Sequence, residues 1–265
     1  MCHSKVRQKA LITINYDVLH EDDYTLQGKM CDPIAFKATE YPDNMYYHQA
    51  LRAPDKDEFL KAIIKEVNDH IDGNHWELVP VSEVPKGTKV LDSVWAMKRK
   101  QDIMTRQVYK HKVRLNIHGG QQEFGIHYTD TYSPAVNWYT IRLLLILSKI
   151  HDWHTRQIDF ILAYPQADIP FDNYMRLPKG ITTAEGSRDS HVLKLKKNIY
   201  GGQNSGRVWY DYLTEGLENI GFQRSSIDEC LFYRKNVIFF FYVDDGPSQM
   251  RLLPCYLMIL QHLKV

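Results

Sequence analysis

The chain has 265 residues, 44% of them hydrophobic and 25% charged, so it can bury the core of one large domain or two small ones. Its formal net charge of +1 neither favours nor excludes a nucleic-acid partner, because a local basic stripe matters more than the total. The four scattered cysteines form no CxxC pair, which argues against a zinc site or disulfide framework and fits a reducing intracellular compartment.

Residues 1–45 mix charged residues, Tyr and Pro without a clear period, which predicts a poorly ordered N-terminal tail. No secretory signal opens the chain, and its longest apolar runs, about ten residues, are too short to cross a bilayer. A helix is then expected to begin with a capping box, in which Asp55 is the N-cap and Glu58 follows three residues later. Apolar residues continue at helical spacing as far as Ile71, and Gly73-Asn74 ends the helix.

Short β-like runs follow at residues 76–80, 90–97 and 108–117, and the charged segment between the last two predicts a hairpin tip. This hairpin is unusually basic. Only Asp92 and Asp102 oppose nine basic residues, which are Lys86, Lys89, Lys98, Arg99, Lys100, Arg106, Lys110, Lys112 and Arg114. Two interpretations stay open: a solvated face, or a face that lies against a phosphate backbone.

The second half of the chain predicts several further elements. They are a mostly buried helix over residues 140–150, strands over 155–161 and 192–195, a turn at 200–202, an amphipathic helix over 209–220 closed by Gly221, and a hairpin of strands 230–233 and 237–243. Pro165 is expected to end the strand at 155–161.

Two adjacent carboxylates, Asp244 and Asp245, follow the fully apolar run at 237–243. A strand of this kind is buried on both faces or nearly so, and two unpaired carboxylates at its end would repel each other. A divalent cation removes that cost, because Mg²⁺ prefers hard oxygen ligands. A plain Asp-Asp turn after a strand is the alternative interpretation.

Asp159 lies inside a second apolar, β-like run. If strands 155–161 and 237–243 are neighbours, Asp159 and Asp244 can share two metal ions about 4 Å apart. Such a pair of ions suits in-line phosphoryl transfer, which requires no His or Ser nucleophile.

The chain resembles the reverse transcriptase of copia-type long-terminal-repeat retrotransposons. The resemblance covers roughly residues 45–246 and is carried, in order, by residues 75–80, 112–115, 132–136, 140–144, 157–160, 174–180, 193–197, 200–201, 207–209, 221–222, 228–232 and 242–245. It implies an α+β fold with polymerase fingers and palm, in which a central antiparallel sheet packs on helices.

The resemblance implies a fingers-like region at residues 46–150. Within it, Lys112 and Arg114 would grip the incoming triphosphate, with Lys98 as a competitor for that role. The implied partners are an RNA or DNA template with its primer, and deoxynucleoside triphosphates. No membrane partner is expected, and the oligomeric state is left open.

The palm-like catalytic region implied by the resemblance covers residues 151–250. Asp159 and Asp244 would be the catalytic, metal-binding aspartates, with the carbonyl of Phe160 as a further metal ligand and Asp245 as an acidic neighbour. The cofactor implied is a pair of Mg²⁺ ions, with Mn²⁺ as an alternative.

Three further residues would contact the nucleotide or the template. Tyr164 would block a ribose 2′-hydroxyl and so favour deoxynucleotides, whereas without the family it would be interpreted as a core aromatic residue. Tyr200 and Gly201 would lie along the nucleotide and template.

The sequence also departs from the family pattern. Gly202-Gln203-Asn204 lacks the lysine usual after Tyr200-Gly201, and Gly246-Pro247 is expected to interrupt the strand that pairs back on 237–243. Residues 251–265 are expected to be a tail unrelated to the family, with the chain truncated and the thumb absent.

Three functions are compatible with these features. The leading one is a retrotransposon-derived RNA-directed DNA polymerase. The alternative is a non-catalytic nucleic-acid-binding remnant of such a polymerase. An unrelated metal-dependent nuclease or phosphatase would use the same ions but would not explain Lys112, Arg114, Tyr164 and Tyr200 in this order.

Overall fold

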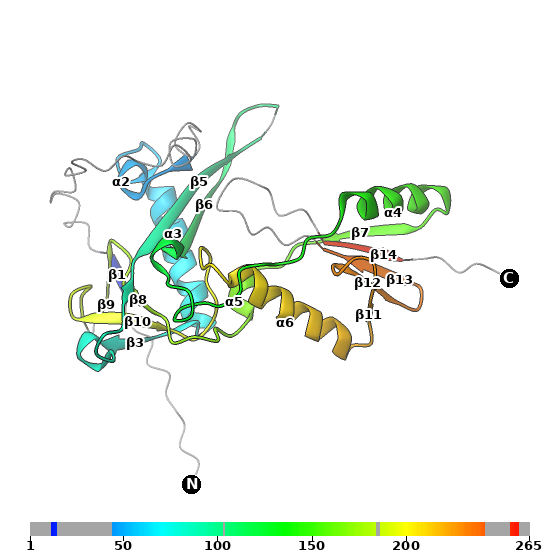
Figure 1. Ribbon diagram of the computed structural model, residues 1–265. Helices are drawn as coiled ribbons and strands as arrows, with labels where there is room; N and C mark the ends of the chain where they lie inside the picture. The colour runs from blue at the N-terminus through cyan, green and yellow to red at the C-terminus, as the bar shows by residue number, and fades with distance from the viewer. Residues whose placement is uncertain (1–11, 15–43, 103, 184–185, 242–254, 260–265) are drawn as a thin grey trace, which may run out of the picture. The chain divides into compact units, whose positions relative to one another are not determined.

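The computed structural model describes residues 12–14, 44–102, 104–183, 186–241 and 255–259 (Figure 1). The chain divides into two compact units. Unit 1 holds residues 1–121 and 172–196, and unit 2 holds residues 122–171 and 197–265. No helix in the described part of the chain is long and apolar enough to cross a membrane.

A twisted hairpin and a helix form the centre of unit 1. Strands β5 (Ser93–Gln101) and β6 (Val108–Ile117) pair antiparallel, and β2 (Asn44–Met45) pairs with the other edge of β5. Helix α3 (Lys56–Asp72) packs on β6 and buries Phe59, Ile63 and Val67. The helix and the hairpin predicted from the sequence are therefore both confirmed.

The start of α3 differs from its prediction. Asp55 is the N-cap residue, but its side chain makes no capping hydrogen bond, and Glu58 pairs with Lys61 at 2.6 Å instead. The Asp55 carboxylate accepts hydrogen bonds from Arg99, at 2.6 and 2.8 Å, and lies 2.6 Å from Nε2 of His111. The predicted capping box is wrong because charged and ring donors from the hairpin occupy the carboxylate.

Two smaller sheets complete unit 1. The first has the order β3-β10-β8-β4, in which β10 is antiparallel to both neighbours and β4 is parallel to β8. Its strands are β3 (Trp76–Pro80), β10 (His191–Leu195), β8 (Tyr174–Arg176) and β4 (Val90–Leu91). The second pairs β1 (Ile12–Ile14) with β9 (Ile181–Thr183), so one segment of the expected N-terminal tail forms a strand. Short helical turns lie at α2 (Tyr47–Ala50), η2 (Val81–Glu83) and η3 (Gly119–Gln121).

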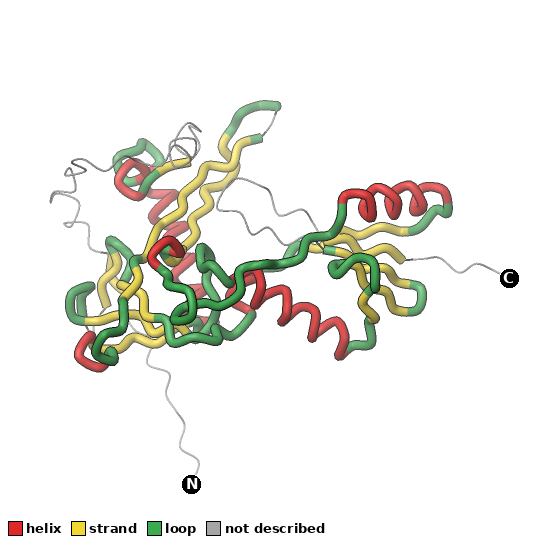
Figure 2. The backbone as a smooth tube through the Cα atoms, in the orientation of Figure 1, coloured by secondary structure: helices red, strands yellow, loops and turns green. Residues whose placement is uncertain are grey.

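Unit 2 is built on a five-stranded antiparallel sheet of order β11-β12-β13-β14-β7. Its strands are β11 (Gln223–Arg224), β12 (Leu231–Arg234), β13 (Val237–Phe240), β14 (Cys255–Ile259) and β7 (His154–Ile158). Its helices are α4 (Trp138–Ile150), α5 (Ala163–Gln166) and α6 (Ser205–Asn219). Figure 2 shows the yellow strands of this sheet with α4 running along it.

Strand β14 corrects one expectation from the sequence. It pairs along the whole of β13, from Val237 opposite Ile259 to Phe240 opposite Tyr256, and its other edge pairs with β7. A strand therefore does return on β13, whereas the predicted interruption at Gly246-Pro247 lies outside the described residues. Cys255–Ile259 contains no proline, so each of its residues has a backbone N–H for pairing.

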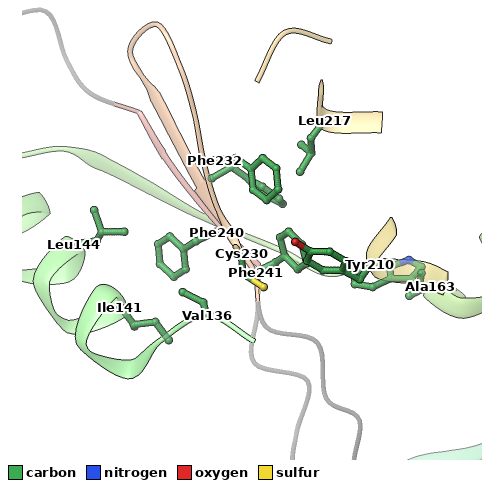
Figure 3. Packing of buried hydrophobic residues seen from close by; sticks show 12 residues of the cluster. Val136, Ile141, Leu144, Ala163, Tyr210, Leu217, Cys230, Phe232, Phe240 and Phe241 are labelled. Carbon is green, nitrogen blue, oxygen red and sulfur yellow. The ribbon is translucent and has the colours of Figure 1, made fainter. Parts of the chain in front are cut away.

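Apolar side chains cover both faces of β13 (Figure 3). Phe240 points toward Ile141 and Leu144 of α4. Phe241 points the other way, with its ring centroid 6.0 Å from that of Trp209 and 5.8 Å from that of Tyr210, both on α6. Successive residues of a strand face opposite sides, so this packing fixes the end of β13 between two helices. It confirms burial on both faces for residues 239–241 of the predicted run, while Val237 and Ile238 are partly buried and residues 242–243 lie outside the described residues.

Candidate functional site

The carboxyl ends of β7 and β13 lie at one edge of the unit 2 sheet. Each strand is antiparallel to β14, so the two run parallel to each other. Ile158 is opposite Cys255 and Phe240 is opposite Tyr256, so Asp159 and Phe241 follow their strands at the same end. One strand intervenes, and the two ends are therefore about 10 Å apart.

The prediction that Asp159 and Asp244 share two metal ions required the two strands to be neighbours. They are not neighbours, because β14 lies between them in the same sheet. Asp159 is exposed to solvent beyond the end of β7. The other two predicted carboxylates, Asp244 and Asp245, lie outside the described residues.

The chain turns sharply after Asp159. Leu162 adopts φ 49° and ψ 51°, a left-handed conformation that costs a residue with a Cβ about 1–2 kcal/mol. The turn leads into α5 and leaves Phe160 packed edge-on against Trp209, with 5.3 Å between the ring centroids. No local pattern in the sequence predicts this strained residue.

Pro165 has a different role from the predicted one. The strand already ends at Ile158, and Pro165 is the third residue of α5. The first residues of a helix have no intrahelical partner for their N–H groups, so proline is tolerated there.

Tyr164 and Tyr200, to which the resemblance gave separate roles, lie together, with ring centroids 4.9 Å apart. Tyr164 also lies 6.4 Å from the ring of Trp209, and Tyr200 is buried. Gly201 follows with a φ of +84°, a value that favours glycine. Tyr164 therefore packs partly as a core aromatic residue. Asp159 and Tyr164 lie at the two ends of the turn between β7 and α5.

The β5–β6 hairpin of unit 1 has one basic face. Directly opposed residues of an antiparallel pair share a face, and the register opposes Lys98 to Lys112, Lys100 to Lys110, and Ala96 to Arg114. We call Lys98, Lys100, Lys110, Lys112 and Arg114 the basic face. Like charges directly opposed destabilise a sheet, so two such pairs favour a surface that meets a polyanion.

The other face of the hairpin is used for packing. Trp95, Met97, Val113 and Leu115 are buried on it. Arg99 and His111 lie further along the same face, where both contact Asp55 and the ring of Phe59. Lys98 and Lys112, the two lysines considered for triphosphate binding, lie directly opposite each other on the basic face.

The candidate residues fall into two groups. Lys112 and Arg114 belong to unit 1, whereas Asp159, Phe160 and Tyr164 belong to unit 2 together with Tyr200 and Gly201. Within the described ranges, no group of three or more His, Cys, Asp or Glu side chains could hold a metal ion. Asp159 is the described carboxylate of the predicted metal site, and Mg²⁺ commonly takes one or two carboxylates together with substrate phosphates.

Sequence reasoning did not single out Asp228, which is buried. Its carboxylate accepts hydrogen bonds from the N–H of Asn137 at 2.9 Å, the hydroxyl of Thr140 at 2.7 Å and the N–H of Cys230 at 3.0 Å. It therefore ties the loop before β12 to the start of α4. An isolated Asp in a polar segment carries no sequence signal of burial.

Comparison with known proteins identifies a related family. A family model described as "Reverse transcriptase (RNA-dependent DNA polymerase)" matches residues 73–250. The Pol polyprotein from transposon TNT 1-94 of Nicotiana tabacum is 29% identical over 74% of this chain and 15% of that polyprotein. The one from transposon RE2 of Arabidopsis thaliana is 30% identical over 78% of this chain and 14% of its own length.

A more distant relative is the truncated transposon Ty1-A Gag-Pol polyprotein of Saccharomyces cerevisiae, 27% identical over 77% of this chain and 16% of that polyprotein. The chain thus spans about one seventh of the length of the curated relatives that it matches. No solved structure matches the chain.

Proposed function

Because the chain belongs to the reverse transcriptase (RNA-dependent DNA polymerase) family, we propose that it catalyses RNA-directed DNA synthesis. The reaction is template-directed addition of a deoxynucleotide to a primer 3′-end, with release of pyrophosphate. The observation that supports it most directly is the parallel course of β7 and β13 to one edge of a sheet. Asp159 follows one of these strands, and the sequence Tyr242-Val243-Asp244-Asp245 comes shortly after the other.

Asp159, Asp244 and the carbonyl oxygen of Phe160 would hold two Mg²⁺ ions, or Mn²⁺ in their place, with Asp245 as an acidic neighbour. The bound ions would activate the 3′-hydroxyl and neutralise charge on the triphosphate. Strand ends about 10 Å apart leave room for facing carboxylates with ions between them. The packing of Phe241 and Phe160 on Trp209 supports this assignment, because it anchors both strand ends on one helix.

Further residues are proposed to bind or select the nucleotide. Lys112 and Arg114 would bind the triphosphate, and the remaining lysines of the basic face would contact template or primer phosphates. Tyr164 would exclude a ribose 2′-hydroxyl, with Tyr200 supporting its ring from behind and Gly201 next to the template.

The test is primer extension on an RNA template with Mg²⁺, comparing the unaltered protein with Asp244→Asn. We expect incorporation by the unaltered protein and its loss in the variant, because one metal ligand is weakened. The matched control is Asp152→Asn, which changes an exposed carboxylate of unit 2 and should keep full activity.

Incorporation that survives Asp244→Asn would overturn the catalytic assignment. The alternative function, a non-catalytic nucleic-acid-binding remnant, rests on the basic face alone. It would be favoured if the unaltered protein incorporates no nucleotide yet binds an RNA–DNA hybrid in a salt-sensitive manner.

A further inference from the structure

Helix α4 exposes a line of large apolar side chains. One side of the helix buries Ile141, Leu144 and Ser148. The opposite side leaves exposed 79% of Tyr139, 57% of Leu143, 58% of Ile146 and 65% of Ile150. Isolated exposed apolar residues are ordinary, but four in a row along one helix mark an interaction surface.

The spacing of these four residues is specific. They follow one another at intervals of four, three and four positions, which is the repeat of a helix-packing seam. At 100° per residue they fall within an arc of about 60°. We call Tyr139, Leu143, Ile146 and Ile150 the α4 seam. Two further apolar residues of α4 are exposed, Trp138 at 53% and Leu145 at 42%, and by helical spacing they lie beyond Arg142 and Lys149. The seam itself is narrow enough to match one helix lying alongside.

One flank of the α4 seam is basic. Arg142 and Lys149 are exposed, lie seven positions apart and therefore stand on one line of the helix. Helix α4 contains no acidic residue, and within the described part of the chain neither Arg142 nor Lys149 forms an ion pair. A partner that covers the seam therefore gains from carboxylates opposite this flank.

We propose that the α4 seam is the docking site for a single amphipathic helix of a partner protein, with apolar residues at the same three–four spacing and acidic residues along one flank. A second copy of this chain fits less well, because a two-fold antiparallel pair of α4 helices places the two basic flanks against each other. A membrane surface fits less well too, because Arg142 and Lys149 interrupt the exposed apolar residues of α4, whereas membrane-surface helices carry an unbroken apolar face. The proposal does not depend on the polymerase assignment.

The test uses the full chain and a labelled designed peptide of about 21 residues, three heptads, with Leu along the seam and Glu along one flank. A matched peptide carries Lys in place of Glu. Fluorescence anisotropy is expected to show about ten-fold tighter binding of the acidic peptide, and the double variant Arg142→Glu/Lys149→Glu should reverse that preference.

Two further variants distinguish binding at the α4 seam from nonspecific binding to exposed apolar residues. Leu143→Gln/Ile146→Gln is expected to abolish binding of the acidic peptide. Ile227→Gln, which changes a residue that is 94% exposed outside α4, should leave binding unchanged. Thermal unfolding checks that each variant folds.

Equal binding of the two peptides, or a preference that survives charge reversal, would overturn the proposal. So would dimerisation in sedimentation velocity that Leu143→Gln/Ile146→Gln removes while the peptides do not bind, since the seam would then belong to a second copy. Binding to phosphatidylserine vesicles under the same conditions, again without peptide binding, would assign the seam to a membrane surface.

Discussion

The ring of Tyr164 lies against the ring of Tyr200, with 4.9 Å between the centroids and 52° between the planes. Tyr200 is itself buried, so its ring is a rigid support for the ring of Tyr164. If Tyr164 excludes a ribose 2′-hydroxyl, its selectivity depends on the contact with Tyr200, because an unsupported ring can move aside.

Replacement of Tyr200 is therefore expected to weaken the discrimination between deoxynucleotides and ribonucleotides. Tyr200→Leu should lower the ratio of deoxynucleotide to ribonucleotide incorporation about three- to ten-fold, the equivalent of one aromatic pair. Tyr200→Phe keeps the ring and should keep the ratio. A ratio that Tyr200→Leu leaves unaltered would show that Tyr164 does not select the sugar through this contact.

The basic face predicts a measurable dependence of nucleic-acid binding on salt. Lys98, Lys100 and Lys110 lie on one face of the β5–β6 hairpin, and each lysine that contacts a phosphate contributes about 0.7–0.9 to the slope of log K against log salt. Lys100→Ala/Lys110→Ala should therefore reduce that slope by about 1.4–1.8 on an RNA–DNA hybrid.

The control for the basic face is Lys61→Ala on α3, where the lysine pairs with Glu58. This variant should leave the slope unchanged. An equal decrease in both proteins would mean that net charge, rather than the basic face, governs binding.

Asp55 predicts how the stability of unit 1 varies with pH. Hydrogen bonds from Arg99, followed by that of His111, hold the pKa of the Asp55 carboxyl far below its ordinary value of 3.8. A carboxyl whose pKa is lower in the folded state stabilises the fold fully above the ordinary value, and this stabilisation is lost as the pH falls toward the folded-state pKa.

Asp55→Asn is expected to lower the free energy of unfolding at pH 7 by about 1–3 kcal/mol, since a charged acceptor is replaced by a neutral one. It should also flatten the decrease in stability below pH 4, measured by urea unfolding. Asn is a good N-cap residue, so helix initiation is preserved. If the free energy of unfolding decreases as steeply below pH 4 in the variant as in the unaltered protein, the pair of Asp55 with Arg99 adds no net stability.

The sequence predicts the elements that local patterns specify. The helical spacing from Phe59 to Val67 and the apolar run ending at Phe241 indicate α3 and β13, because each buries a periodic face. The alternation along β5 and β6 also determines which lysines share a face. The family resemblance supplied roles for Tyr164 and Tyr200, but it did not predict that their rings are in contact, because the two residues lie far apart in the chain.

Long-range competition decides what the sequence does not predict. Asp55 has the sequence of a capping residue, but two donors more than 40 residues away occupy its carboxylate. Residues 252–263 look unrelated to the family, yet Cys255–Ile259 fills the gap between β13 and β7, because two exposed strand edges will pair with any apolar segment of suitable length. Such outcomes depend on tertiary contacts that no window of sequence contains.

Leu162 offers a test of strain at the turn after Asp159. Its positive φ is unfavourable for any side chain with a Cβ. The free energy of unfolding of Leu162→Gly should therefore be larger than that of Leu162→Ala by about 1 kcal/mol, although both variants remove the same apolar contacts. Thermal or urea unfolding of the two variants measures this difference. Equal stabilities would mean that the turn relaxes and stores no strain.

Asp228 is expected to be the most sensitive carboxylate for the stability of unit 2. Its oxygens accept from Asn137, Thr140 and Cys230, and Asp228→Asn replaces one acceptor by a donor that faces donors. The free energy of unfolding should fall by about 1–3 kcal/mol, because a buried charged acceptor is lost and its partners are left unsatisfied. Glu229→Gln, at the exposed neighbouring position, is the matched control and should change stability little. If the two variants unfold at the same urea concentration, the link between α4 and the loop before β12 does not hold the unit together.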